Sequence, residues 1–261
     1  MKLLIFTCSN YSDLWKNHMI LMEKYWSNHP DYLFCSDGYS KYDFNPEKIF
    51  VSNSDMTGRM IDCLETLDDE YILFTLDDYF VKKPVNVSKL NMILNYVKNN
   101  KIDYCRIFDQ PKVKGTPTTL KKVINLPLTK TYEVNFYPGI WRRESLLKIL
   151  KRNENIWVCE ARLTSRFRKL NFKGIQIDNA KLLEFEDIIR KGKYLRKAYR
   201  FLKREGLYIS ERPKRTIKET IYLDIQTFVS RFFPSKIKNV IKNKLRKKGR
   251  VFYSDYADTE E

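Results

Sequence analysis

Short apolar runs alternate with segments of helical spacing through the first two-thirds of the chain, and this alternation constrains the fold more than any other feature. The runs of strand length are 2–8, 31–35, 47–52, 71–76, 103–109 and 172–178. Segments with apolar residues at helical spacing stand between them, at 11–26, 52–70, 88–100 and 143–151. Strands that are apolar throughout are buried on both faces, and intervening helices supply the crossovers of a parallel sheet. The sequence therefore predicts an α/β domain with a mainly parallel central sheet.

Polar side chains follow three of these strands at the point where each ends. In a parallel sheet the carboxyl ends of the strands share one edge, and ligands bind there. We therefore expect a binding site built from the residues that follow the three strands. These residues are Thr7, Ser9 and Asn10 after the first strand, Asp37 after the second, and Asp77 and Asp78 after the strand at 71–76.

Two adjacent carboxylates, Asp77 and Asp78, close the apolar run in "EYILFTLDDYF". Neighbouring negative charges repel each other unless a cation or hydrogen-bond donors neutralise them. Mg²⁺ and Mn²⁺ are bound through one or two carboxylates together with substrate phosphates, which fits this pair. The alternative is a polar turn after a strand, with no ligand. The position of the pair at the end of a central strand favours a metal site.

Residues 1–180 resemble the nucleotide-sugar-dependent glycosyltransferases of the GT-A fold. The resemblance rests on "LLIFTCSN", on "CSDG", on "EYILFTLDDYF" and on the later "YPGIWRRESLLKIL" and "NIWVCE". It is strongest to bacterial capsule, O-antigen and cell-wall polysaccharide enzymes. The resemblance implies a Rossmann-like GT-A domain, a nucleotide-sugar donor such as a UDP-sugar, a glycan or lipid-linked acceptor, and a divalent cation, Mn²⁺ or Mg²⁺.

The resemblance also assigns roles to the polar residues at the strand ends. Asp78, with Asp77, would bind the metal ion. The pair is not a strict D-x-D motif, because Leu76 and Tyr79 occupy the neighbouring positions, and this favours Asp78 as the ligand. The implied donor-binding residues are Thr7, Ser9, Asn10, Asp37, Arg59 and Asp77, with the guanidinium of Arg59 suited to phosphate oxygens.

Glu160, in "NIWVCEARLTSRF", matches the acidic residue that such enzymes place at a helix start as the base of an inverting transfer. We expect the helix N-terminus to stabilise its ionised form. The alternatives are ordinary helix-start chemistry and an acceptor-binding role. Tyr137, Trp141 and Trp157 are predicted to contact the acceptor sugar, with core packing as the alternative for each.

The net charge of +17 belongs to the last quarter of the chain. Residues 1–189 carry +4, residues 190–250 carry +17, and residues 251–261 carry −4. We therefore expect a catalytic domain at 1–183 and a basic helical region at 184–261. Residues 232–250 have the pattern of a basic amphipathic helix on an anionic membrane surface. The alternatives are nucleic-acid binding, with metal-dependent nucleotide processing, and packing on the main domain with a solvated basic face.

The five cysteines are scattered without a C-x-x-C pair, and the two histidines are not at metal-ligand spacing. These features are typical of a reduced, cytoplasmic protein without structural zinc. The longest apolar runs are far shorter than the roughly 20 residues of a membrane span, and the N-terminus has no cleavage-site pattern. Together with the basic region, this predicts a cytoplasmic protein held at the inner face of the cell membrane.

Overall fold

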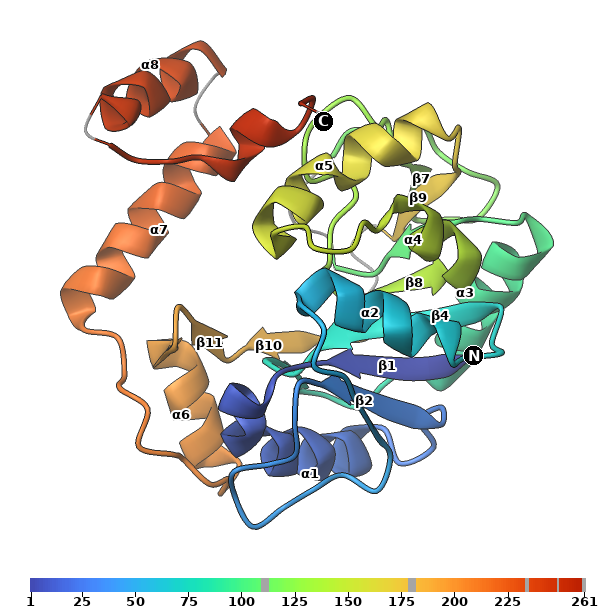
Figure 1. Ribbon diagram of the computed structural model, residues 1–261, viewed down its shortest axis with the longest axis vertical. Helices are drawn as coiled ribbons and strands as arrows, with labels where there is room; N and C mark the ends of the chain where they lie inside the picture. The colour runs from blue at the N-terminus through green and yellow to red at the C-terminus, as the bar shows by residue number, and fades with distance from the viewer. Residues whose placement is uncertain (109–112, 178–181, 233–234, 248, 260–261) are drawn as a thin grey trace. The chain divides into compact units, whose positions relative to one another are not determined.

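The computed structural model describes residues 1–108, 113–177, 182–232, 235–247 and 249–259 (Figure 1). These residues form two compact units. The first is Met1–Glu186 together with Tyr256–Glu261, and the second is Asp187–Asp255. The first unit contains all the strands that the sequence predicts to end in polar residues.

An eight-stranded sheet in the order β3-β2-β1-β4-β8-β6-β9-β7 is the centre of the first unit. Its first four strands in this order are parallel, β6 and β9 are parallel to each other, and β8 and β7 run antiparallel to their neighbours. The predicted α/β fold with a mainly parallel central sheet is therefore confirmed. The strand bounds are β1 Lys2–Phe6, β2 Tyr32–Ser36, β3 Ile49–Val51, β4 Tyr71–Leu76, β6 Tyr104–Arg106, β7 Val123–Asn125, β8 Gly139–Arg142 and β9 Gly174–Ile177.

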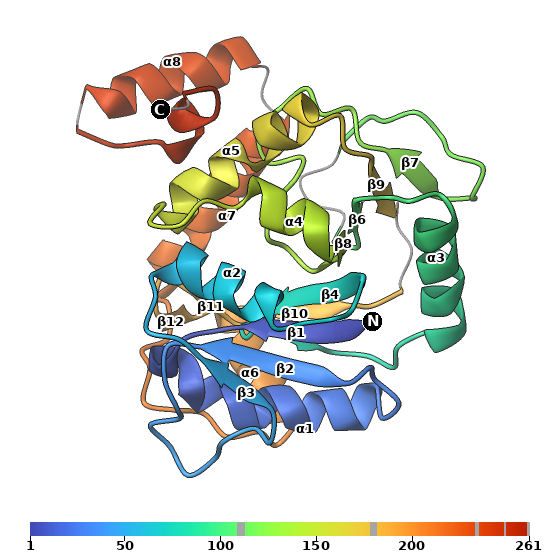
Figure 2. The ribbon, with the colours of Figure 1, turned by 45° about the vertical axis from the view of Figure 1, so that its right-hand side comes forward.

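Alternating side chains of β1 pack into two hydrophobic cores, one on each face of the sheet. Leu3 and Ile5 contribute to the core shared with α1 (Trp15–Tyr25) and α3 (Val87–Asn99). Leu4 and Phe6 contribute to the core shared with the helices of the other face. Those helices are α2 (Met56–Glu65), α4 (Arg143–Ile149) and α5 (Ile156–Lys169). Figure 2 shows α1 and α2 on opposite sides of β1 and β2. Burial on both faces explains why this strand is apolar throughout.

Two further elements of the first unit lie next to the predicted site. The 3-10 helix η1 (Ser9–Leu14) follows β1 and leads into α1. The short strand β5 (Tyr79–Val81) directly follows the carboxylate pair and pairs with β10 (Phe185–Asp187) in a separate two-stranded sheet. The chain therefore turns sharply at Asp77 and Asp78, between two strands of different sheets.

The antiparallel strand β8 requires glycine at its first position. A Cβ atom on Gly139 would lie 2.9 Å from the backbone oxygen of Cys105 and 2.9 Å from Cε2 of Tyr104. Contacts this short do not occur between real Cβ atoms and their neighbours, so a larger residue would push β8 away from β6. Gly139 thus allows β8 to fit between β4 and β6.

The second unit begins with strands rather than with the helices predicted from residue 184 onward. After β10, the strands β11 (Ile189–Arg190) and β12 (Lys193–Tyr194) form a hairpin. Lys191 and Gly192 form its two-residue turn. Both have positive φ, as a type I′ hairpin turn requires. The helices follow: α6 (Arg196–Arg204), α7 (Ile217–Phe232), α8 (Ser235–Arg246) and the 3-10 helix η2 (Tyr253–Tyr256). Among the described residues, no helix combines the length and the apolar character that crossing a membrane requires.

Candidate active site

The parallel strands β1, β2 and β4 end in register at one edge of the sheet. Phe6 is paired with Cys35 on one side and with Leu76 on the other. The residues that follow these strands are therefore brought to the same edge, as the sequence predicted. The backbone confirms the placement: the N–H of Thr7 donates to Cys35 O at 2.9 Å, and that of Asp77 donates to Phe6 O at 3.3 Å.

Asp77 is buried in a hydrogen-bonded network beneath this edge. Its carboxylate accepts a hydrogen bond from the Thr7 hydroxyl, which in turn accepts one from Trp15 Nε1 at 2.8 Å. Asp77 is only 6% exposed, whereas Asp78 is half-buried. The structure thus separates the two adjacent carboxylates. Asp77 fixes the end of β4, and Asp78 is the one that a bound group can reach more easily.

His18, on α1, extends the same network through the backbone of Asp77. No role was predicted for it from the sequence. Its Nδ1 donates to the backbone oxygen of Asp77 at 3.2 Å, and its ring contacts Phe34 and Phe80 edge-on. Burial lowers the pKa of His18 to about 4, so the ring is neutral at physiological pH. The sequence signal was its position one helical turn after Trp15, on the buried face of the helix.

Asp37 holds the start of η1 in place. Its Oδ1 accepts from the Ser9 N–H at 2.6 Å. Burial by itself would raise the pKa of Asp37, but the hydrogen bonds from Ser9 and the charge of Arg59 outweigh it, and the pKa is lowered. Asp37 is therefore an ionised acceptor. Asn10, by contrast, is exposed, and its side-chain oxygen accepts from Lys41 Nζ.

Arg59 brings a buried positive charge to this edge from α2. It is 3% exposed, and its guanidinium lies over the Phe6 ring at 5.3 Å. Its Nη2 donates to Thr7 O at 3.5 Å and its Nη1 to Ser54 O at 3.4 Å, both at the limit of hydrogen bonding. Among the described residues, no carboxylate lies within ion-pair distance of Arg59. Such a charge is costly to bury, and an anionic ligand would reduce the cost.

Glu160 lies in the second turn of α5, not at its start. The helix is capped by Asn155, whose side chain accepts from the N–H groups of Trp157 and Val158. The expectation that the helix N-terminus stabilises the ionised form of Glu160 is therefore wrong. Burial instead raises the pKa of Glu160, although its Oε1 accepts from Phe136 N at 3.2 Å. A raised pKa makes the carboxylate a stronger base.

Phe136 links Glu160 to the edge where β4 ends. The register pairs Gly139, at the start of β8, with Phe74 of β4, so the segment before Gly139 lies beyond that edge. The rings of Phe136 and Phe74 are 5.9 Å apart. Glu160 is thus joined, through the N–H of Phe136, to the segment that precedes β8 and packs against Phe74 of β4.

The three predicted acceptor-binding aromatics have different environments. Trp141 is fully buried against Tyr104, with the two rings tilted and their centroids 4.1 Å apart, so the prediction of acceptor contact is wrong for Trp141. Tyr137 is half-buried among aromatics, 5.9 Å from the Tyr79 ring and 5.2 Å from that of Phe108. Trp157 is 56% exposed in the first turn of α5. Trp157 is the most accessible of the three.

A divalent cation at this edge would need ligands from its substrate. In the described part of the chain, no group of three or more His, Cys, Asp or Glu side chains could hold a metal ion. Asp78 and Asp77 can supply one or two carboxylate oxygens. Mg²⁺ and Mn²⁺ sites of that kind are completed by phosphate oxygens and water, so the residues fit an ion that binds together with a diphosphate.

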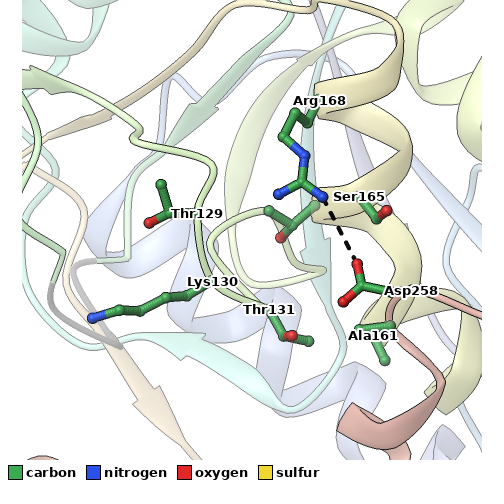
Figure 3. A pocket seen from close by; sticks show the side chains of 9 residues that line it. Thr129, Lys130, Thr131, Ala161, Ser165, Arg168 and Asp258 are labelled. Carbon is green, nitrogen blue, oxygen red and sulfur yellow. Dashed lines mark ion pairs between the residues drawn. The ribbon is translucent and has the colours of Figure 1, made fainter.

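A small polar pocket lies beside α5 (Figure 3). Ser165 and Arg168 of α5 line it together with Thr129–Thr131, Ala257 and Asp258, and Arg168 Nη2 is 3.7 Å from Asp258 Oδ1. The cavity measures about 50 Å³. This is the space of one or two water molecules, so the pocket is too small for a nucleotide.

No protein-family model and no curated protein matches this chain, whereas solved structures resemble it in fold. TarS 1-349 from S. aureus has 16% identity and a TM-score of 0.46, over 69% of this chain and 59% of that one. A cytidylyltransferase from Leptospira borgpetersenii has 11% identity and a TM-score of 0.44, over 90% and 97%. The galactosyltransferase LgtC, with donor and acceptor analogs, has 11% identity and a TM-score of 0.37, over 77% and 78%. The chain spans 36% of the longer TarS structure that it also matches.

These likenesses include a galactosyltransferase and a cytidylyltransferase. At such low identity they assign no residue and no substrate.

Proposed function

We propose that this protein is a glycosyltransferase that transfers a sugar from a nucleotide-sugar donor to a glycan or lipid-linked acceptor. A UDP-sugar is the proposed donor, and a bacterial surface polysaccharide, such as capsule or lipopolysaccharide, the proposed product. The observation that carries the proposal is the buried guanidinium of Arg59, which has no carboxylate within ion-pair distance among the described residues, at the same edge as Asp37 and the Asp77–Asp78 pair. A donor diphosphate would give Arg59 a directly paired anion.

The proposed donor site uses the charges at the edge in different ways. The ionised Asp37 accepts hydrogen bonds from the nucleoside, and Arg59 and the backbone around Thr7, Ser9 and Asn10 face the diphosphate. Asp78, with Asp77 beneath it, would hold Mn²⁺ or Mg²⁺ against the phosphate oxygens. When bound, the ion neutralises the negative charge that develops on the leaving diphosphate.

The proposed chemistry is a single displacement with inversion. The Glu160 carboxylate takes the proton from an acceptor hydroxyl as the hydroxyl oxygen bonds to the anomeric carbon of the donor. The bond from that carbon to the diphosphate oxygen breaks, and the nucleoside diphosphate leaves with the electron pair. The raised pKa of Glu160 supports this role, because a more basic carboxylate accepts the proton more readily. Trp157, exposed on the same helix, is the proposed acceptor contact.

A thermal-shift panel of nucleotide sugars, with and without Mn²⁺, tests this proposal. We expect a UDP-sugar to raise the melting temperature of the wild type, because ligands that bind only the folded state stabilise it. Asp78→Ala should lose that shift. Glu160→Gln should keep the shift in melting temperature. Its turnover should fall by about 10²- to 10⁴-fold, because the base takes part in the proton transfer and not in donor binding.

The matched control is Glu144→Gln, which changes an exposed carboxylate on α4 and should alter neither property. Equal loss of donor binding and turnover in both site variants would contradict the separate roles. The product identifies the reaction class. Release of nucleoside diphosphate supports glycosyl transfer. Release of pyrophosphate from a nucleoside triphosphate and a sugar phosphate would instead support nucleotide processing, the alternative drawn from the sequence.

A further inference from the structure

Helix α7 of the second unit carries a row of exposed apolar side chains along one face. Ile217, Ile221, Ile225 and Phe228 recur at helical spacing, and each is between 52% and 61% exposed. None of them belongs to either hydrophobic core. Single exposed apolar residues are common on protein surfaces, but an aligned row over three turns of a helix marks an interaction surface. We call these four residues the α7 stripe.

The other face of α7 is polar and partly engaged. Glu219 pairs with Lys193 at 2.6 Å and accepts from the N–H of Thr216 at 2.8 Å. Thr220 donates back to Thr216 O at 2.9 Å, and Thr227 is exposed. The helix is therefore amphipathic, and its polar face makes the contacts within the second unit that orient the stripe outward.

Helix α8 repeats this arrangement with a strong positive charge. Ile237, Val240 and Ile241 are exposed on one face, and the sequence of α8 contains five Lys and Arg residues but no Asp or Glu. The whole second unit, Asp187–Asp255, has 21 Lys and Arg against six Asp and Glu, a net charge of +15. An occupant of this surface must therefore bring both apolar contact and negative charge.

We infer that the second unit binds the surface of an anionic lipid bilayer, with the α7 stripe and the apolar face of α8 inserted at the acyl boundary. Amphipathic helices with basic polar faces bind such surfaces through buried apolar area and attraction to anionic headgroups. A nucleic acid supplies the negative charge, but it has no apolar layer in which the three isoleucines of the α7 stripe could be buried.

Vesicle sedimentation of the full chain tests the inference, with vesicles of phosphatidylcholine alone or mixed with phosphatidylglycerol. The wild type should sediment with the mixed vesicles and stay in solution with the neutral ones. Ile221→Glu/Ile225→Glu should bind the mixed vesicles at least about tenfold more weakly, because it places two charges where the helix enters the bilayer. The matched control, Thr220→Glu/Thr227→Glu, adds the same charge to the polar face. Its affinity for the mixed vesicles should fall much less.

Three results would overturn the inference. Vesicle binding by the isoleucine variant equal to that of the control variant would show attraction without insertion. Salt-sensitive binding of a generic oligonucleotide, without vesicle binding, would assign the surface to nucleic acid. A melting temperature several degrees lower in the isoleucine variant than in the control variant would show that the stripe packs inside the protein. These measurements use neither donor nor acceptor, so they are independent of the proposed sugar transfer.

Discussion

Residues Met1–Glu186 with Tyr256–Glu261 carry 28 Lys and Arg against 26 Asp and Glu, a net charge of +2, whereas Asp187–Asp255 carries +15. The first unit also buries ionisable groups, including Asp77, His18 and Arg59 at the sheet edge. The second keeps large apolar side chains such as Ile225 and Phe228 exposed.

This difference separates two ways of using side chains. Buried polar groups cost free energy unless they have hydrogen-bond or ion-pair partners. They are therefore found where they orient other side chains or bind a ligand. Exposed apolar groups change the stability of the unbound protein little. Covering them with another surface is favourable, because it removes apolar area from water. This difference agrees with the two proposals, a small ligand held in fixed geometry by the first unit and an extended surface bound by the second. Substitutions should therefore affect stability strongly at the buried positions of the first unit and weakly along the exposed α7 stripe of the second.

The largest effect is expected from Trp141→Ala, because this side chain is fully buried against Tyr104 and Phe167. Removing it should lower the free energy of unfolding by about 3–5 kcal/mol, measured by urea denaturation. Trp157→Ala, on the exposed first turn of α5, is the matched control and should change stability by less than about 0.5 kcal/mol. Similar costs for the two variants would contradict the core position of Trp141.

The buried His18 should make stability fall in acid. Its pKa is about 4 in the folded protein, below the ordinary value of 6.5, so the unfolded chain binds the proton first. The stability it contributes is complete above pH 6.5 and is lost as the pH falls through 4, by about 3 kcal/mol in all. Unfolding free energies measured between pH 7 and pH 4 should fall less steeply for His18→Gln than for the wild type.

His29→Gln is the control for this pH dependence, because it replaces the other of the two histidines in the chain. Between pH 7 and pH 4 the unfolding free energy of His29→Gln should fall more steeply than that of His18→Gln. If the two single variants flatten the curve equally, the acid sensitivity does not arise from the site beneath Asp77.

Arg59→Met should separate stability from ligand binding. The substitution removes a buried charge that makes long hydrogen bonds to Thr7 and Ser54, so unfolding free energy should stay within about 1 kcal/mol of the wild type or rise. The affinity for a nucleoside diphosphate should fall about 10- to 100-fold, measured by calorimetry, because a charge-assisted contact is lost. An unchanged affinity would remove Arg59 from the donor site.

The parallel half of the sheet and its polar edge could be predicted because their signals are local. Runs such as 71–76 are apolar for the length of one strand, and a polar pair marks where the strand ends. The strand β8 could not be predicted, because its four residues, Gly139–Arg142, stand directly before a helix and carry no period. Its place between β4 and β6 depends on contacts with residues more than 30 positions away.

The environment of single side chains was harder to predict than the strands. Trp141 and Trp157 look equivalent in sequence, yet one is in the core and the other is exposed, because tertiary packing decides which side of its element faces the sheet. The same holds for Glu160, whose place in the second turn follows from Asn155 acting as the cap. At residues 185–194 the apolar spacing suggested a helix, but the positive φ of Lys191 and Gly192 makes a hairpin.

The smallest effect is expected from Ile225→Ser on α7. This substitution tests whether the exposed apolar side chains of the second unit contribute little to stability. Because Ile225 is 55% exposed, the free energy of unfolding should change by less than about 0.5 kcal/mol, measured by urea denaturation in the absence of lipid. The matched control in the first unit is Ile140→Ser, at a fully buried position of β8, which should cost several kcal/mol because it buries a hydroxyl in place of an apolar side chain. A large loss for Ile225→Ser would mean that α7 is packed against another surface of the protein in solution. The contrast between the buried positions of the first unit and the exposed stripe on α7 would then be wrong.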